Sequence, residues 1–250
     1  MKGENTEQRC ESRVMIHQSL TLLGTVHSDP GGFSRTRVFL ERHRPDLILV
    51  EISAFGLKYR QERSSELRRT FLDSLRMVSG KMNIDFGRAV RHVRIASILR
   101  QISVPFEYRA SSAYAKKTGT DLIPVDCSDF SREWIEKTWP EMISAQNIER
   151  LLELESSGPG VSSLYARAAE RISLGSSLPE TLTETDALRW RKREQFMAAE
   201  ITSALQRFSP ERPVYIGGWW HLSRGGSVKT IRELLGIEAD SCRLLNRTEV

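Results

Sequence analysis

The chain carries the same short sequence unit twice, once near each end. In each copy an apolar, strand-like run leads into a Gly-x-x-His tetrad, then a glycine pair, then a stretch with helical periodicity. The first copy comprises residues 19–23, Gly24-Thr-Val-His27, Gly31-Gly32 and residues 33–43, and the second comprises residues 213–216, Gly218-Trp-Trp-His221, Gly225-Gly226 and residues 227–235. A single four-residue match arises easily by chance, but two with matching flanks do not. The chain therefore joins a strand to a helix through a histidine-bearing loop at two places.

Each tetrad suits a ligand-binding loop. Glycine lets the backbone turn sharply off a strand end because it has no Cβ. The histidine is then carried at the carboxyl end of the strand, where open α/β sheets bind their ligands. A glycine pair before a helix leaves N–H groups that can hold an anion, aided by the helix dipole. We therefore expect both histidines on loops at one sheet edge, with an anion cradle beside each. The alternative is a histidine satisfied by backbone contacts in a tight turn.

Short apolar runs alternate with longer amphipathic ones along the chain, which indicates an α/β fold. The pattern predicts a mixed, mostly parallel sheet with helices on both faces. Strands are expected at 19–23, 47–52, 104–108, 122–125, 213–216 and 243–245, and helices at 33–43, 61–77, 87–101, 111–117 and 183–208. We expect residues 1–12 to form a flexible polar tail and 13–250 a single α/β domain, in which 130–210 is mainly a helical insertion.

Two carboxylates end the central apolar runs. Glu51 closes the run at 47–50, and Asp126 follows 122–125. A carboxylate at the end of a buried strand is costly unless it is paired or bound to a cation. If these strands run parallel to those before His27 and His221, all four side chains reach the same edge. Two imidazoles and Glu51 would then form a site for a divalent metal with positions open for water or substrate. An ion pair between Glu51 and a nearby arginine is the alternative.

The helix expected at 183–208 contains Arg193 one turn before Met197, an apolar residue of its buried stripe. A partly buried guanidinium suits an anionic substrate or a developing oxyanion, since it is always charged and offers a planar fork of donors. The alternative is that Arg193 lies on a solvent-exposed face of the helix and has no specific role. Spacing alone does not distinguish Arg193 from the other arginines of this helix.

Four motifs in order resemble the TraB/PrgY/GumN family. They are Leu23-Gly-Thr-Val-His27, Pro45-Asp-Leu-Ile-Leu-Val-Glu51, Arg193-Glu-Gln-Phe-Met-Ala198 and Val214-Tyr-Ile-Gly-Gly-Trp-Trp-His-Leu222. The segment from Glu107 to Asp126 looks like the middle part of the same family. The resemblance covers about residues 20–236. The wider group includes the Tiki proteases and the erythromycin-esterase-like and ChaN-like proteins.

The resemblance implies an α/β fold in two related halves, with a cleft built from both tetrads. Its catalytic residues would be His27, Glu51, Arg193 and His221; His27, His221 and Glu51 would hold the metal. Gly24, Gly218 and Asp126 would line the cofactor site. Tiki members are described as metal-dependent peptidases that use manganese or cobalt, and TraB and PrgY members are linked to shutting down peptide pheromones. For this chain we expect manganese, cobalt or zinc.

The chain departs from the family pattern at two places. Cys127 follows Asp126 where the family has arginine, and the arginine expected shortly after Glu51 is replaced around Gly56, with Arg60 as a displaced candidate.

Composition limits the partners and the compartment that we expect for the chain. The net charge is +5, but acidic residues are interspersed with the arginines, and no aromatic–basic nucleic-acid signature occurs. No apolar run approaches the ~20 residues of a membrane span. The three cysteines, Cys10, Cys127 and Cys242, show no paired spacing, which favours a reducing compartment. We expect a soluble cytoplasmic protein; Cys127 is either an inert thiol or a nucleophile.

Three functions fit the sequence. The first is a metal-dependent hydrolase of peptide or other amide or ester bonds, with Glu51 as ligand or general base and Arg193 at the oxyanion or a substrate carboxylate. The second is a non-catalytic protein that binds a peptide or a haem-like ligand in the same cleft. The third is a metal-free, esterase-type hydrolase with one histidine as general base. The substrate is a peptide or small molecule, and the sequence does not give the oligomeric state.

Overall fold

The computed structural model describes residues 19–154, 160–174 and 183–247. The chain divides into two compact units. The first, here called the sheet unit, comprises Met1–Ile52, Phe106–Cys127 and Ser162–Val250; the second, the helical unit, comprises Ser53–Pro105 and Ser128–Val161. The tail expected at residues 1–12 lies outside the described residues. The region expected as one insertion, 130–210, supplies helices to both units.

The sheet unit contains a five-stranded sheet in the order β3-β2-β4-β1-β5, and every pairing in it is parallel. The strands are β1 (Thr21–Thr25), β2 (Leu47–Val50), β3 (Asp121–Pro124), β4 (Pro213–Gly218) and β5 (Cys242–Leu244). The predicted α/β fold is confirmed. The strands of the two tetrads, β1 and β4, are direct neighbours, with Thr25 opposite Gly218. Because the strands run in parallel, their carboxyl ends lie at one edge.

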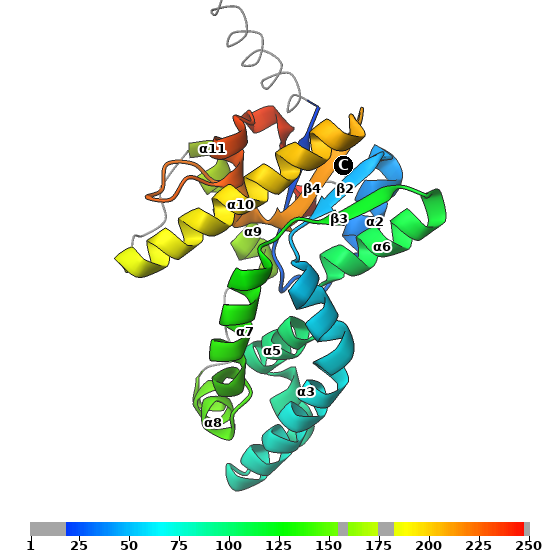
Figure 1. Ribbon diagram of the computed structural model, residues 1–250. Coiled ribbons are helices and arrows are strands. Elements are labelled where there is room, and N and C mark those ends of the chain that lie inside the picture. The colour runs from blue at the N-terminus through cyan, green and yellow to red at the C-terminus, as the bar shows by residue number, and fades with distance from the viewer. Residues whose placement is uncertain (1–18, 155–159, 175–182, 248–250) are drawn as a thin grey trace, which may run out of the picture. The chain divides into compact units, whose positions relative to one another are not determined.

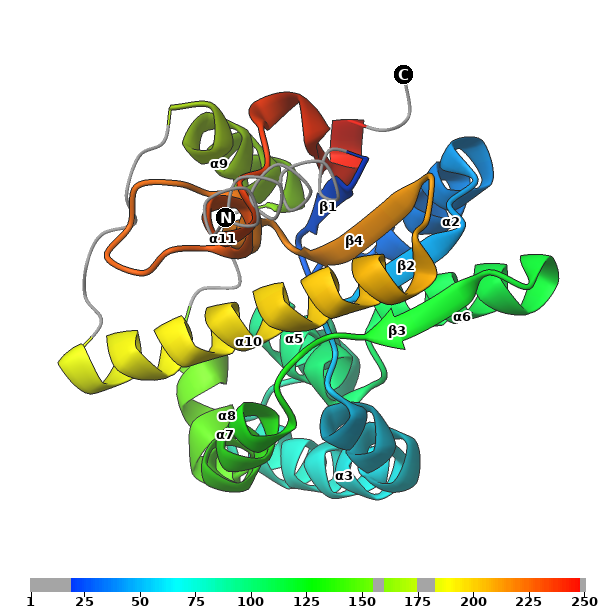
Figure 2. The same cartoon turned by 45° about the horizontal axis from the view of Figure 1, so that its top comes forward.

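Helices cover both faces of the sheet (Figures 1 and 2). They are α2 (Gly32–His43), α6 (Phe106–Thr118), α9 (Val161–Leu174), α10 (Glu184–Phe208) and α11 (Ile231–Leu235), with short 3-10 turns η1 (Trp219–Leu222), η2 (Ala239–Ser241) and η3 (Leu245–Arg247). Helix α10, yellow in Figure 2, crosses one face, and α2 and α6 pack together behind the other. None of the described helices is both long and apolar enough to cross a membrane.

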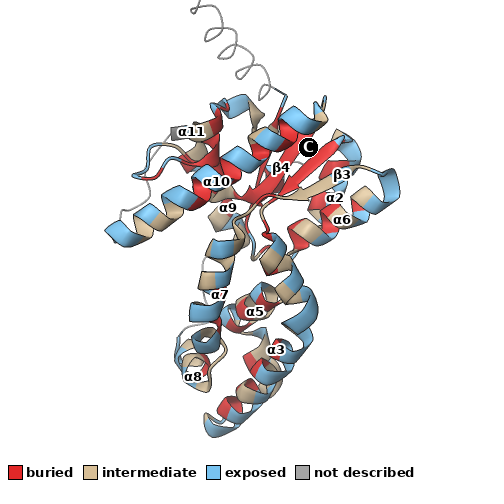
Figure 3. Cartoon of the chain, viewed as in Figure 1, coloured by how far each residue is buried: buried red, intermediate tan, exposed pale blue. Residues whose placement is uncertain are grey.

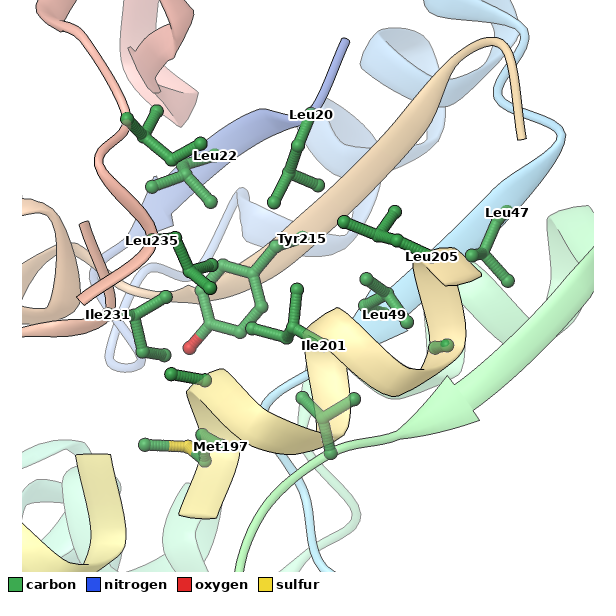
Figure 4. Close-up of a cluster of buried hydrophobic side chains, with 14 of the residues drawn as sticks. Leu20, Leu22, Leu47, Leu49, Met197, Ile201, Leu205, Tyr215, Ile231 and Leu235 are labelled. Atoms are coloured by element: carbon green, nitrogen blue, oxygen red, sulfur yellow. The ribbon is translucent and has the colours of Figure 1, made fainter. Parts of the chain in front are cut away.

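The core follows from the alternation of side chains along the strands. On one face, Leu22, Leu49 and Tyr215 pack against Met197 and Ile201 of α10 (Figure 4). The alternate residues of the same strands are equally buried, so the sheet is covered on both faces; in Figure 3, β4 is red along its length. Such two-sided burial explains the near-continuous apolar runs of a parallel sheet.

One predicted strand was wrong. Residues 104–108, expected as a strand, include the start of α6, which also absorbs the helix expected at 111–117. Pro105 precedes the helix, where its missing N–H costs nothing, and Glu107 places an acid in the first turn, where it favours the helix dipole.

The helical unit contains α3 (Ala54–Lys81), α4 (Phe86–Arg91), α5 (Val93–Ile102), α7 (Ser128–Met142) and α8 (Ala145–Glu153). Its core is a second hydrophobic cluster centred on Phe71, Leu75, Ile98 and Trp139. The helix expected at 61–77 is part of the longer α3, and the one expected at 87–101 is divided at His92 between α4 and α5.

Candidate functional site

The four predicted side chains at strand ends lie together in the sheet unit. Glu51 follows β2 directly, His27 and Asp126 lie two residues beyond β1 and β3, and His221 lies three residues beyond β4. The ladder continues past the assigned strand ends, since Glu51 N–H donates to the Ile216 carbonyl at 2.9 Å. The backbone therefore delivers all four side chains to one sheet edge.

Glu51 is the centre of the group, and its side chain is 7% exposed. Its Oε1 accepts a hydrogen bond from Arg193 Nη2 at 2.7 Å and lies 3.0 Å from His221 Nε2. Its Oε2 accepts the Gly218 N–H at 2.6 Å and lies 3.8 Å from His27 Nε2. Burial raises the pKa of Glu51, but the cationic His221 and Arg193 outweigh it and hold the pKa well below its usual value. Glu51 is therefore a carboxylate, and each of its oxygens faces one tetrad histidine.

Arg193 binds two carboxylates, Asp126 and Glu51. It binds Asp126 through two parallel bonds, Nε to Oδ1 at 2.8 Å and Nη2 to Oδ2 at 2.9 Å, and Nη2 also reaches Glu51. Its guanidinium lies over the Trp190 ring, 5.1 Å from the centroid. Burial lowers the pKa of Arg193, but Asp126 and Glu51 more than compensate and raise it. The bidentate geometry that arginine alone offers thus fixes the direction of the Glu51 carboxylate.

His221 is buried, with its side chain 2% exposed. Its Nδ1 faces Glu194 Oε1 at 2.6 Å, and the other oxygen of Glu194 accepts the Ile231 N–H at 2.7 Å. Burial lowers the pKa of His221, but the charges of Glu194 and Glu51 outweigh it and raise the pKa to about 10. The expectation that both histidines lie on loops was wrong for His221, because its tetrad continues into the 3-10 turn η1, where its ring lies between two carboxylates.

His27 is the open member of the pair, and its side chain is 58% exposed. Its Nδ1 donates to Glu107 Oε1 at 2.7 Å, and the Thr25 hydroxyl donates to the same oxygen at 2.8 Å. Desolvation by the surrounding protein atoms lowers the pKa of His27, but the charge and hydrogen bond of Glu107 outweigh it and raise the pKa to about 9. Its Nε2 points toward Glu51.

Sequence reasoning missed the two carboxylates behind the histidines, Glu107 and Glu194. Both are buried, at 1% and 0% exposure. A signal existed for Glu194, since it lies one turn before Met197 in the buried stripe of α10, where a carboxylate needs a partner. Glu107 was hidden because its segment read as a strand.

The tetrad glycines have different roles. A Cβ on Gly218 would lie 2.9 Å from His27 Nε2, so this glycine leaves room for the ring, and its N–H holds Glu51. A Cβ on Gly24 would lie 3.0 Å from the Trp219 Cα and 3.1 Å from the Leu244 side chain, so Gly24 allows the neighbouring backbone to pack closely. Gly218 therefore borders the site, whereas the contacts of Gly24 are packing contacts.

The predicted anion cradles at the glycine pairs were wrong, because carboxylates of the chain itself fill them. The Gly31 N–H donates to Asp29 Oδ1 at 2.9 Å. The Gly225 N–H donates to Glu233 Oε1 at 3.2 Å. In both copies the glycine pair stabilises its own loop.

The donor types at the site, two imidazoles and carboxylates, are those that divalent metal ions bind. Metal-binding histidines usually donate their second ring nitrogen to a carboxylate, as His27 does here to Glu107, and Glu194 Oε1 lies 2.6 Å from His221 Nδ1. Ligand atoms about 2.1 Å from an ion lie roughly 3.0–3.4 Å apart at right-angled or tetrahedral geometry, close to the 3.0 and 3.8 Å between the Nε2 atoms and Glu51. Within the described ranges, no group of three or more His, Cys, Asp or Glu side chains lies in an arrangement that could hold a metal ion; of the two tetrad histidines, the exposed His27 stands further from Glu51, at 3.8 Å against 3.0 Å for His221.

The formal charge of the site is also compatible with a bound cation. Four carboxylates and one guanidinium meet here, so neutral imidazoles leave a net charge of −3. One divalent ion can therefore take the place of the two imidazole protons. Metal binding at histidines is coupled to such proton release.

Cys127 and Arg60 stand at the two departures from the pattern that the resemblance implies, and each has contacts of its own. The Cys127 N–H donates to Asp126 Oδ1 at 2.7 Å, and the thiol is free and partly exposed. Arg60 lies in the helical unit, where Nη1 donates to the Gly56 carbonyl at 3.0 Å. Comparison of the chain with protein-family models, curated proteins and solved structures found no match.

Proposed function

We propose that this chain is a metal-dependent hydrolase of peptide, amide or ester bonds, in which His27, His221 and Glu51 hold the ion. One observation carries the proposal: the Nε2 atoms of both tetrad histidines face opposite oxygens of Glu51, while each Nδ1 rests on its own buried carboxylate. The same residues are those that the resemblance to the TraB/PrgY/GumN family implies. That resemblance, and the peptide substrate it suggests, belong to the proposal.

A bound divalent ion supplies Lewis-acid polarisation of a carbonyl and lowers the pKa of water. The residues of the chain divide the remaining work. His27 forms the exposed side of the site, from which substrate approaches. His221 anchors the buried side. Glu51 is ligand or general base for water.

Arg193 has a positioning role in this proposal. Its guanidinium is 9% exposed and bound to Asp126 and Glu51, so it orients the central carboxylate and offsets its charge. This geometry favours action through Glu51 over the direct contact with an oxyanion that the sequence suggested.

A metal-free hydrolase is the second candidate, and the environment of His27 favours it. The ring is largely exposed, and its Nδ1 is oriented by Glu107. A base oriented by a third group is the arrangement found in nucleophilic and general-base catalysis. In that mechanism the neutral His27 ring, which forms as pH rises through its pKa of about 9, takes the proton of the attacking water at Nε2.

Metal analysis combined with turnover separates the candidates. The purified protein is assayed for bound metal and against peptide, amide and ester libraries, with chelator and after return of Mn²⁺, Co²⁺ or Zn²⁺. We expect one ion per chain, turnover that chelator abolishes, and loss of both in His27→Ala and His221→Ala. His92, whose Nε2 contacts the Leu154 carbonyl in the helical unit, provides the matched control His92→Ala.

The other outcomes contradict the proposal in different ways. Turnover that persists in chelator and is lost in His27→Ala identifies the metal-free hydrolase. Binding of a peptide or haem-like ligand without turnover under any metal identifies a non-catalytic binding protein.

A further inference from the structure

His27 stands on a tight turn that the chain closes at both ends. The turn comprises residues 26–29, and the Asp29 N–H donates to the Val26 carbonyl at 2.8 Å. Val26 and Asp29 are buried, at 6% and 2% exposure, whereas the His27 side chain between them is largely exposed. The direction of the exposed ring therefore depends on its backbone as well as on the Glu107 contact at Nδ1.

One hydroxyl from a distant helix spans this turn. Tyr165 of α9 is 1% exposed, and its hydroxyl accepts the Val26 N–H at 3.2 Å and donates to Asp29 Oδ2 at 3.1 Å. The same oxygen atom thus holds the residue before His27 and the acid two residues after it. Burial raises the pKa of the Tyr165 hydroxyl, so it stays protonated and can donate.

Asp29 is fixed in turn from its other side. Its Oδ1 accepts the Gly31 N–H at 2.9 Å and pairs with Arg35 Nη2. A fully buried carboxylate is costly unless its charge and lone pairs are matched. Here an arginine, a backbone N–H and the Tyr165 hydroxyl all contribute, so both carboxylate oxygens of Asp29 have polar partners. We call the contacts of Tyr165 and Asp29 with this turn the brace.

The second tetrad has a different support. His221 lies within η1 and is held on both ring nitrogens by Glu51 and Glu194. Among the described residues, His27 has a hydrogen-bonding partner on Nδ1 only, and its Nε2 stands 3.8 Å from Glu51. With Nδ1 held by Glu107, the position of the turn then sets the Nε2 direction of His27.

We propose that Tyr165 and Asp29 are positioning residues that hold His27 toward Glu51. The proposal rests on the hydrolase function proposed above for the same site. Neither residue touches the reacting groups; both act through the backbone of the turn.

The variant Tyr165→Phe tests this, because it removes only the hydroxyl. We expect kcat to fall roughly 10-fold with KM nearly unchanged, in line with the effect of residues that orient metal ligands. Tyr114→Phe is the matched control, since Tyr114 is also buried but lies in the second half of α6, against β2 and β3 at the edge where they begin. Asp29→Asn is a second variant, which should lower kcat in the same way.

A readout that does not need turnover keeps this test separate from the proposed function. In protein labelled with ¹⁵N-histidine and held in chelator, Tyr165→Phe should shift and broaden the ring resonances of His27 and leave those of His221 unchanged. If wild type has no hydrolase activity, the proposed function fails while this result still supports the brace. Wild-type His27 resonances and a wild-type kcat in both soluble variants overturn the brace. An equal loss in Tyr114→Phe also overturns it.

Discussion

The two Gly-x-x-His copies begin alike and end differently. Each leaves the carboxyl end of a parallel strand, and those strands are neighbours. After the first tetrad the chain makes a turn braced by Tyr165, and His27 faces solvent. After the second it forms η1, and α10 brings Glu194 against a buried His221. A repeated motif therefore fixes where a side chain leaves the sheet, while the elements that arrive later decide its burial and its role.

The difference in burial between His27 and His221 agrees with the division of roles proposed above. Glu51 joins the copies, because one oxygen faces each histidine. The buried His221 suits permanent anchoring, and the exposed His27 suits contact with substrate and water. The following predictions test this division, beginning with the largest expected effect.

Removing each histidine should separate the copies most clearly. In chelator, His221→Ala should cost about 3 kcal/mol or more of unfolding free energy, because it leaves Glu194 buried beside an empty position. His27→Ala should cost only about 1 kcal/mol, since the ring is exposed. Leu49→Ala, which opens a cavity in the core, provides the benchmark at about 2–5 kcal/mol. Urea unfolding that gives equal costs for both histidines would remove the distinction.

Arg193 should matter to both copies, because it orients the carboxylate they share. Arg193→Lys should lose activity nearly as badly as Arg193→Ala, on the order of 100-fold, since lysine lacks the planar fork that binds Asp126. The exposed neighbour is the control, and Arg191→Ala should leave kcat/KM and stability nearly unchanged. Mild, equal effects at both arginines would contradict the role given to Arg193.

Alanine at Gly217 and at the adjacent Gly218 should affect the buried and the exposed side of the site differently. A Cβ on Gly217 would lie 2.3 Å from the Tyr215 hydroxyl and 2.8 Å from Glu51 Oε2, both in the core of the site. We expect Gly217→Ala to cost about 1–3 kcal/mol through overpacking. Gly218→Ala meets chiefly the exposed His27 ring, which can move. It should therefore cost less stability and act mainly on turnover. Thermal unfolding of the two variants gives the comparison, and the reverse order would count against it.

Stability against pH gives the smallest effect. The pKa values of His27 and His221 are raised from 6.5 to about 9 and about 10. Their contribution is therefore present in full below pH 6.5 and is lost as pH rises through 9 to 10. Glu51 has a lowered pKa, so its contribution is present above pH 4.5 and is lost as pH falls further. In chelator, His221→Ala should flatten the alkaline loss more than His27→Ala, because His27 is screened by solvent.

Added divalent metal should oppose the alkaline loss over the same range, because it binds neutral imidazoles. A metal-induced stabilisation that shrinks between pH 6.5 and 8.5 would contradict metal binding at these rings. Chemical denaturation with and without Mn²⁺ measures the difference.

The strand ends were the predictable part of the site. The runs that became β1, β2 and β4 are apolar because these strands are buried on both faces, and the polar residues that follow the strands mark the edge. The repeated tetrads located His27 and His221, and the ends of the apolar runs located Glu51 and Asp126. Parallel pairing then accounts for their meeting in space.

The partners of those residues were harder to see. Glu107 belongs to a helix whose first turn looks like a strand, because Val104 and Phe106 flank a proline that in fact precedes the helix. The burial of His221 depends on α10, which comes from another part of the chain, and nothing within its own tetrad encodes it. The Tyr165 brace joins residues 139 and 136 positions apart, beyond the reach of local pattern.

Anomalous diffraction from crystals grown with Mn²⁺ or Co²⁺ tests the central claim most directly. We expect one peak within about 2.0–2.3 Å of His27 Nε2, His221 Nε2 and an oxygen of Glu51. Glu107 and Glu194 should still contact the Nδ1 atoms of the two histidines. A site without a peak at saturating metal, with His221 still against Glu51, would contradict it, as would a peak elsewhere in the molecule.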